Sequence, residues 1–209
     1  MAKHKDTDES EGKAVRQRLL QAALDLFTEK GYAATSVREI VDAAGVTKPV
    51  LYYYFKSKEG IYLELFREPF AFFSQILEDA RNGEGGVRAR VVRLFDRIFA
   101  LFIARLKEAR LMYSIYYGPQ QGAPFFDFEG FHLKMREVTG LIVREGIEKG
   151  ELRAVDADAA TWALIGALNF IMEEQLCHGS PMIDRTGLSR ILDLIFEGLI
   201  TKKKKGALS

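Results

Sequence analysis

The sequence predicts an all-α protein. Apolar residues recur at intervals of three and four in nearly every segment, which is the period of an amphipathic helix. No stretch shows the sustained period-two alternation and β-branched enrichment that indicate a strand. The chain has 209 residues, 48% of them hydrophobic, which is enough to bury a real core. We expect about nine helices, divided between a small N-terminal three-helix domain and a larger C-terminal helical domain.

The first predicted helix runs from about Lys13 to Lys30. Its apolar face carries Leu20, Ala23, Leu24 and Phe27. Gly31 ends the helix as a left-handed cap. The preceding residues 1–12 are polar and charged, without the apolar stretch of a secretory signal, so we expect a disordered arm there.

Two short helices joined by a tight turn follow. Ser36 and Glu39 form a capping box for the first of them, and Gly45 ends it. Thr47 is expected to cap the second. Pro49 fits its first turn, because the amide hydrogen that proline lacks would have no partner there. With the long first helix packed across them, these elements predict a helix-turn-helix DNA-binding domain over residues 13–60.

The second short helix, Lys48 to Phe55, is the predicted recognition helix, because a helix fits the major groove, where base edges differ. Leu51 and Phe55, four residues apart, should face the core. The residues left to face outward are Thr47, Lys48, Val50, Tyr52 and Tyr53. Tyrosine hydroxyls can donate to phosphates, and Lys48 can reach a base edge or a phosphate. Three further cations lie on the same edge: Arg38, Lys56 and Lys58. The alternative is that the three consecutive tyrosines are packing residues.

The chain resembles the TetR family of bacterial repressors over roughly residues 13 to 65. The matching segments are Ala22–Phe27, Gly31–Tyr32, Thr35–Ile40, Ala43–Lys48 and Leu51–Glu59. The resemblance implies a two-fold dimer on a palindromic DNA operator, which is released when a small molecule enters the larger domain. It places DNA-contacting residues at Thr35, Ser36, Arg38, Thr47, Lys48, Pro49, Tyr52, Tyr53 and Lys58. Pro49 departs from the family, in which a small residue is common there.

Longer helices are predicted beyond residue 57, within a ligand-binding and dimerisation domain over residues 61–203. They lie near Ser57–Ala80, Val87–Lys107, Ala109–Tyr117, Phe125–Lys149, Ala157–His178 and Thr186–Lys203. Pro69 should kink the first of these or start a new helix at Glu68, because it cannot donate to the carbonyl of Leu65. We expect a flexible tail at 204–209. The run Lys202–Lys205 could contact phosphate or anionic lipid, or form a solvated helix end.

The larger domain is rich in aromatic residues. Six of the 24 aromatic residues precede residue 60, which leaves 18 beyond it. Such a domain could hold an apolar or aromatic effector oriented by a few polar groups. The candidate ligand-binding residues are Phe99, Phe102, Tyr113, Tyr116, Phe128, His132, Trp162 and Asn169. The alternative for each aromatic is a place in the core.

Two apolar stripes near the C-terminus predict a dimer interface in which two helix pairs form a four-helix bundle. The candidate interface residues are Leu164, Ala167, Leu168, Ile171, Leu188, Ile191, Leu192, Ile195 and Leu199. The alternative is that both stripes face only their own core. Two-fold pairing would place two recognition helices about one DNA turn apart.

Other classes of protein find little support in the composition. The single cysteine, Cys177, excludes a disulfide framework and a cysteine-based zinc site, and favours the cytoplasm. The apolar stretch Ala159–Met172 is too short to span a membrane. The glycine-rich residues 83–86 lack the Gly-Lys-Ser/Thr of a phosphate loop.

Neither a catalytic triad nor a metal or cofactor site is predicted, since the three histidines are far apart in sequence. Only Glu174 and His178, four residues apart, could share a metal ion. An enzyme and an architectural DNA-binding protein without a ligand remain the alternative functions.

Overall fold

The computed structural model describes residues 2–118, 122–178 and 182–200, with side chains from residue 10 onward. This part of the chain forms nine α-helices and no strand, which confirms the predicted fold class. An isolated antiparallel bridge joins Leu152 to Ile200. None of the helices described is long and apolar enough to cross a membrane. The predicted tail at 204–209 and the Lys202–Lys205 run lie outside the described residues.

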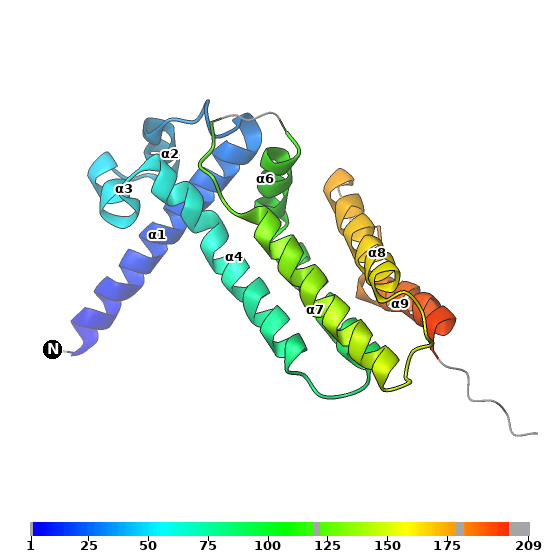
Figure 1. Cartoon of the computed structure of the whole chain (residues 1–209). Coiled ribbons are helices and arrows are strands. Elements are labelled where there is room, and N and C mark those ends of the chain that lie inside the picture. The colour runs from blue at the N-terminus through cyan, green and yellow to red at the C-terminus, as the bar shows by residue number, and fades with distance from the viewer. Residues whose placement is uncertain (1, 119–121, 179–181, 201–209) are drawn as a thin grey trace, which may run out of the picture. The chain divides into compact units, whose positions relative to one another are not determined.

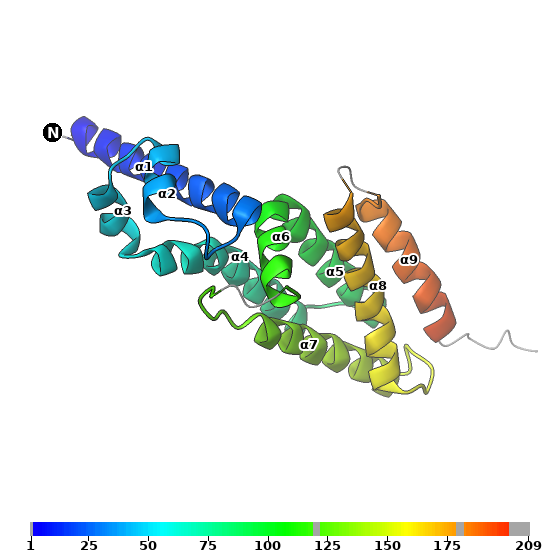
Figure 2. The ribbon, with the colours of Figure 1, turned by 90° about the horizontal axis from the view of Figure 1, so that it is seen from above.

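The helices follow one another along the chain; Figure 1 labels all of them except α5, which Figure 2 labels. They are α1 (Ala2–Lys30), α2 (Val37–Ala44), α3 (Lys48–Phe55), α4 (Lys58–Arg81), α5 (Val87–Ala104), α6 (Leu106–Tyr116), α7 (Phe128–Glu148), α8 (Ala157–Cys177) and α9 (Arg185–Leu199).

The helices belong to two compact units. The first contains α1, α2, α3, α4 as far as Ala71, and α6. The second contains α4 from Phe72, α5, nearly all of α7, α8 and α9. The predicted domain boundaries at residues 60 and 61 stay a prediction.

The first unit is organised around α1, which packs against α2 and α6. Apolar residues at helical spacing on α1, among them Leu19, Ala23 and Phe27, are buried against the short helices. Tyr62 of α4 is fully buried among aromatic rings, with its ring centroid 5.9 Å from that of Phe27. This core holds α2 and α3 in place beneath α1.

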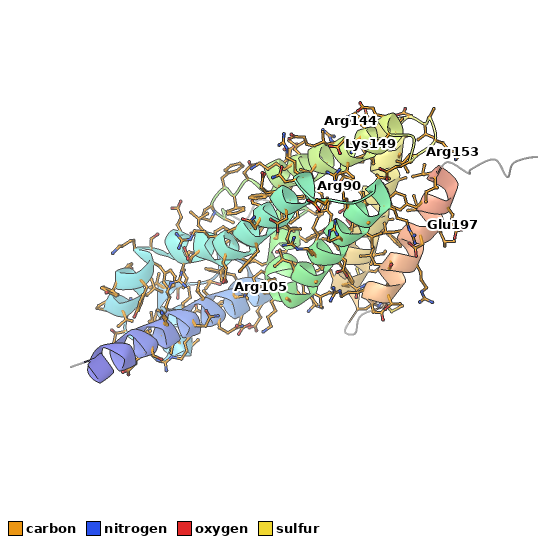
Figure 3. All side chains as sticks on the ribbon, turned by 90° about the horizontal axis from the view of Figure 1, so that it is seen from below. Arg90, Arg105, Arg144, Lys149, Arg153 and Glu197 are labelled. Carbon is orange, nitrogen blue, oxygen red and sulfur yellow. The ribbon has the colours of Figure 1, made fainter. Side chains whose placement is uncertain are left out.

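The core of the second unit lies among α5, α7, α8 and α9. In Figure 2, α8 and α9 lie beside each other, and α5 packs against both. Arg90 of α5, labelled in Figure 3, is buried and pairs with Glu145 of α7 at 2.5 Å. Its Nη2 donates to the last carbonyl groups of α4, those of Ala80 and Arg81. Arg90 therefore joins three helices and satisfies carbonyls that the end of α4 leaves without helical partners.

Several helix boundaries differ from those predicted. α1 begins at Ala2, so the residues expected to form a disordered arm continue the helix; they contain no proline, and their first glycine is Gly12. α4 continues through Pro69, and no new helix starts at Glu68. α9 ends at Leu199 rather than at residue 203, because Ile200 leaves the helix to form the bridge with Leu152.

α7 begins at Phe128 instead of Phe125. Phe125 is 86% exposed and lies outside any helix, whereas the ring centroid of Phe126 lies 4.9 Å from that of Phe70. The amide of Phe128 donates to the carbonyl of Phe126 at 2.8 Å. Anchoring of this segment by an aromatic contact, rather than by helical hydrogen bonds, accounts for the later start.

Candidate nucleic-acid interface

The start of α2 is a complete capping box. The Ser36 hydroxyl accepts from the amide of Glu39 at 3.3 Å, and the Glu39 carboxylate accepts from the amide of Ser36 at 2.8 Å. Lys30, at the end of α1, forms an ion pair with the same carboxylate. The Lys30 hydrogen bond, followed by those from Ser36, lowers the pKa of Glu39 from 4.5 to about 2. The predicted box is confirmed, and it ties α1 to α2.

The turn between α2 and α3 is built on one left-handed residue. Gly45 has φ 65°, a conformation that glycine adopts without steric cost. The amide of Val46 then donates to the carbonyl of Val41 at 3.0 Å, and Val46 packs against the core. This geometry sets the direction in which α3 leaves α2.

α3 begins at the predicted residue, but the predicted side-chain cap is absent. Thr47 is the N-cap residue, and its carbonyl accepts from the amide of Val50 at 3.0 Å. Its hydroxyl makes no capping hydrogen bond, so the predicted side-chain cap is wrong. Pro49 occupies the first turn, where it removes no helical hydrogen bond. The Thr47 hydroxyl is thus not occupied in capping the helix.

The two faces of α3 differ in the way the sequence predicted. Leu51 and Phe55 are buried, at 0% and 6% exposure, and anchor the helix to the core. Tyr52 and Tyr53 are 45% and 73% exposed, and Lys48 and Pro49 are exposed beside them. The Tyr53 ring meets that of its neighbour Tyr54 edge-on, with centroids 5.0 Å apart. A short helix that exposes two tyrosines and a lysine offers hydrogen-bond donors to phosphates and base edges.

Arg16 of α1 supports this helix in a way that the sequence analysis missed. Its guanidinium carbon lies 5.4 Å from the centroid of the Phe55 ring. The same side chain forms an ion pair with Glu64 of α4. Arg16 therefore contacts α3 and α4 together; its spacing along α1 carries no signal of either partner.

Two of the residues expected to contact DNA, Thr35 and Lys58, form hydrogen bonds within the protein. Thr35 is 1% exposed, and its hydroxyl donates to the carbonyl of Gly31 at 2.8 Å. The ammonium group of Lys58 donates to the carbonyls of Tyr32 and Thr35 at 2.9 and 2.8 Å, and lies 4.1 Å from the Tyr32 ring centroid. Burial lowers the pKa of Lys58. Both side chains thus hold the loop before α2, and their role as DNA contacts stays a prediction.

Each of the remaining candidates is exposed on α2, on α3 or at the start of one of these helices. They are Ser36, Arg38, Thr47, Lys48, Pro49, Tyr52 and Tyr53. Within the described part of the chain, the one ion pair of Arg38 is a long contact of 3.7 Å to Asp42, and both side chains are largely exposed. Such a pair contributes little to stability, so Arg38 can exchange Asp42 for a phosphate at small cost.

The predicted ligand-binding residues divide between the two units. Tyr113, Tyr116 and Phe128 belong to the first unit, where Phe128 is buried and Tyr116 is 43% exposed. The others belong to the second unit: Phe99, Phe102, His132, Trp162 and Asn169. Phe99 and Phe102 are buried, whereas Trp162 is 57% exposed. Burial lowers the pKa of His132, which favours its neutral form.

The predicted dimer residues lie mostly inside the chain. Five are buried in the core of the second unit: Leu164, Leu168, Ile171, Leu188 and Leu192. The other four are partly exposed: Ala167, Ile191, Ile195 and Leu199. The buried five pack within their own chain, so a partner would have to contact neighbouring positions.

The described part of the chain contains no cluster of side chains suited to bind a metal ion. No group of three or more histidine, cysteine or acidic residues is placed to hold a metal ion there. His178 Nε2 and Glu174 Oε2 are 3.3 Å apart, with His178 exposed and Glu174 half-buried, and Cys177 is an exposed free thiol.

Comparison with known proteins places these features in a family. The family model described as bacterial regulatory proteins, tetR family, matches residues 19–65. The HTH-type transcriptional repressor KstR2 of Rhodococcus jostii (strain RHA1) is 35% identical over 199 residues, which cover 92% of this chain and 95% of the relative.

Two solved structures extend the comparison to the whole fold. The TetR family transcriptional regulator PfmR from Thermus thermophilus superposes with a TM-score of 0.68 at 26% identity, covering 86% of this chain and 97% of its own. FadR from Bacillus subtilis, solved in complex with stearoyl-CoA, has a TM-score of 0.61 at 20% identity and covers 87% and 98%. The helix-turn-helix geometry, the family model and a relative matched over nearly its whole length agree, and this chain belongs to the TetR family of bacterial transcriptional regulators.

Proposed function

We propose that the protein is a repressor that binds a palindromic DNA operator as a homodimer and leaves it when an apolar or aromatic small molecule binds. The observation that carries the DNA part is the two-faced α3. Leu51 and Phe55 fix this helix to the core, while Lys48, Tyr52 and Tyr53 stay exposed on it. Side chains of these types donate to phosphates and to base edges in the major groove.

Repression is supported by the relative that matches the chain most completely among those described above. KstR2 of Rhodococcus jostii is named a transcriptional repressor. A repressor acts by occupying its operator, which requires a folded DNA-binding domain. The capping box at Ser36 and the anchored α3 support such a role.

An apolar effector is supported by the composition beyond residue 60 and by a relative. FadR, which shares the fold of this chain, was solved with stearoyl-CoA. Our candidates for effector contacts remain the eight residues predicted above. α4 contributes residues to both units. We therefore propose that effector binding shifts its Ser57–Glu68 segment. This shift would alter the spacing between the helix-turn-helix domains of the two copies in the dimer.

A homodimer is supported by apolar side chains that stay exposed on α8 and α9. Phe170 is 64% exposed and Leu194 is 68% exposed. Ala163 and Gly166 lie on the exposed face of α8 and would allow close approach of a second helix. We propose that this face, rather than the buried stripes, meets the second copy.

Selection of binding sites from random duplex DNA, followed by footprinting, tests the function. A single short inverted repeat, protected by a dimer, is the expected result. Broad protection without a preferred sequence would support an architectural protein instead. Absence of DNA affinity at low salt would contradict both roles and leave an enzyme as the alternative.

A further inference from the structure

The short helix α3 is held at its C-terminal end by α1. α3 has eight residues, too few to form a stable helix in isolation, so its direction is set by the side chains that pack against it. Figures 1 and 2 both show α3 beside the N-terminal half of α1. Gly12 and Arg16, four residues apart on one face of α1, lie against the last two residues of α3, Tyr54 and Phe55.

Arg16 is attracted to groups on two different helices. Its guanidinium carbon lies 5.4 Å from the centroid of the Phe55 ring, within the range of a cation–π contact. The same guanidinium forms an ion pair with Glu64 of α4, whose side chain is only 18% exposed. A ring on one side and a carboxylate on another limit the positions open to the guanidinium. The end of α3 is thereby tied to α1 and α4 together.

Gly12 leaves room for the side chain of Tyr54. A Cβ atom on Gly12 would stand 3.1 Å from the Tyr54 hydroxyl oxygen, so a longer side chain there would displace the Tyr54 ring. The ring of Tyr53, which is 73% exposed, meets the Tyr54 ring edge-on, with centroids 5.0 Å apart. Aromatic rings in contact favour this mutual orientation. The packing of Tyr54 on α1 therefore constrains the orientation of the exposed Tyr53.

Stability alone does not account for these two residues. α3 is already anchored to the core by Leu51 and Phe55, which are both buried. The ion pair of Arg16 is partly exposed to solvent, so it contributes at most about 1 kcal/mol. Gly12 lies inside α1, where glycine costs about 1 kcal/mol relative to alanine. Orientation of α3 explains both residues better than stabilisation of the fold.

We propose that Arg16 and Gly12 position α3 against base edges and thereby set the selectivity of the protein among DNA sequences. The inference rests on the proposed function, in which α3 enters the major groove. Neither residue acts by touching DNA, because the Arg16 guanidinium lies at Phe55 and Glu64, and Gly12 carries no side chain. A shift of α3 by about 1 Å would break hydrogen bonds to base edges, whereas flexible lysine and arginine side chains would still reach phosphates.

The test compares two affinities of the full chain at one salt concentration: for DNA selected by the wild type, and for a scrambled duplex of the same length. Arg16→Met keeps the apolar stem and removes the cation. It is expected to lower the ratio of the two affinities about tenfold, while affinity for the scrambled duplex falls less than about threefold. Partial unfolding would lower both affinities by the same factor and leave the ratio unchanged. Arg16→Lys keeps a cation between the ring and the carboxylate, and should restore most of the ratio.

Arg67→Met is the matched control for Arg16→Met. Arg67 pairs with the same Glu64 carboxylate at 2.8 Å, but from within α4, and its side chain is 75% exposed. The substitution removes one positive charge from that carboxylate and leaves the contact with Phe55 in place. The affinity ratio should therefore stay within about twofold of the wild type. A loss equal to that of Arg16→Met would overturn the positioning role of Arg16.

Gly12→Leu tests the second contact, with opposite effects on stability and selectivity. Leucine favours a helix over glycine, so the melting temperature should not fall. The added side chain displaces Tyr54 and should lower the affinity ratio at least about threefold. Ala14→Leu adds bulk at an exposed position of α1 and should bind DNA as the wild type does. An unchanged ratio in Gly12→Leu or in Arg16→Met would overturn the role of that residue.

Failure of this inference can be told apart from failure of the proposed function. A wild-type affinity ratio near one would refute sequence-specific binding, and the positioning role with it. A high wild-type ratio that both variants retain would refute the positioning role alone. Selection of binding sites by Arg16→Met should relax the preference at several base pairs together. Relaxation at a single base pair would show that Arg16 contacts that base itself, and would overturn the proposal.

Discussion

Gly60, in the first turn of α4, lies directly against the backbone of Phe55, the last residue of α3. A Cβ atom on Gly60 would stand 1.9 Å from the carbonyl oxygen of Phe55. The amide of Gly60 also donates to the Ser57 hydroxyl at 2.9 Å, so this side chain caps the start of α4. The angle at which α3 meets α4 therefore depends on the absence of one methyl group.

Gly60→Ala is expected to destabilise the protein by about 2 kcal/mol, because the obstacle is backbone and the helices must separate. Denaturant unfolding followed by circular dichroism measures the change. Gly198→Ala on α9 is the matched control, since a Cβ atom there has nothing within 4 Å. It should leave stability unchanged or slightly raised, and equal effects of both substitutions would contradict the close-contact account.

Lys58 is expected to act on stability as well as on DNA binding. Lys58→Met keeps the apolar stem but removes the two hydrogen bonds to the carbonyls of Tyr32 and Thr35, at a cost of about 2 kcal/mol for a charged donor. Thermal unfolding without DNA measures this cost. Lys48→Met removes an exposed lysine of the same unit and serves as the control, since the assay contains no DNA. A Lys58→Met protein as stable as the wild type would return Lys58 to the role of a DNA contact.

Glu39 makes the capping box sensitive to acid. Its pKa is about 2 in the folded protein, below the ordinary value of 4.5, with Lys30 as the largest cause. A carboxyl with a lowered folded pKa stabilises the protein above about pH 4.5, and this contribution is lost as the pH falls toward 2. Melting temperatures of the wild type and Glu39→Gln should therefore differ most above pH 5 and converge in acid. A difference that stays constant from pH 7 to pH 3 would show that ionisation of Glu39 is not involved.

Among the cationic residues of the second unit, we expect substitution of Arg90 to lower the free energy of unfolding most. Arg90→Met should cost about 3 kcal/mol, because Glu145 loses its buried partner and the end of α4 loses its donors. Arg88, on the same helix, pairs with Asp193 at the surface, and Arg88→Met should cost less than about 1 kcal/mol. Urea unfolding of both variants checks the difference, and similar costs would show that burial of Arg90 carries no special weight.

The structure of α2, the following turn and α3 could be predicted closely from the sequence, because the residues that determine it are close together in the chain. Ser36 and Glu39 are three residues apart, Gly45 marks a left-handed turn, and Leu51 and Phe55 lie one helical turn apart. Each of these features depends on backbone geometry within a few residues. The structure confirms all of them.

Predictions were less accurate for residues whose contact partners lie far away in the sequence. The charge pattern places Lys58 on the DNA side, but its long stem reaches carbonyls 26 and 23 residues away. Apolar periodicity identified the buried faces of α8 and α9 correctly. It could not distinguish a chain's own core from a partner, and Leu164 and Leu192 proved to be fully buried.

The same limit applies to the aromatic residues of the larger domain. Spacing alone cannot separate Phe99, which is buried in the core, from Trp162, which is exposed in a groove. Helix ends are also set by contacts that spacing does not encode. Ile200 leaves α9 for a bridge to Leu152, far earlier in the chain.

The most direct test of the central claim is the affinity of the Lys48→Ala, Tyr53→Ala double variant for DNA selected by the wild type, measured by gel mobility shift. We predict a loss of at least about 30-fold, because both side chains donate to DNA from the exposed face of α3. The control double variant, Lys149→Ala with Tyr117→Ala, removes the same residue types from exposed positions elsewhere and should bind normally. Wild-type affinity in the Lys48→Ala, Tyr53→Ala protein would contradict the assignment of α3 as the recognition helix.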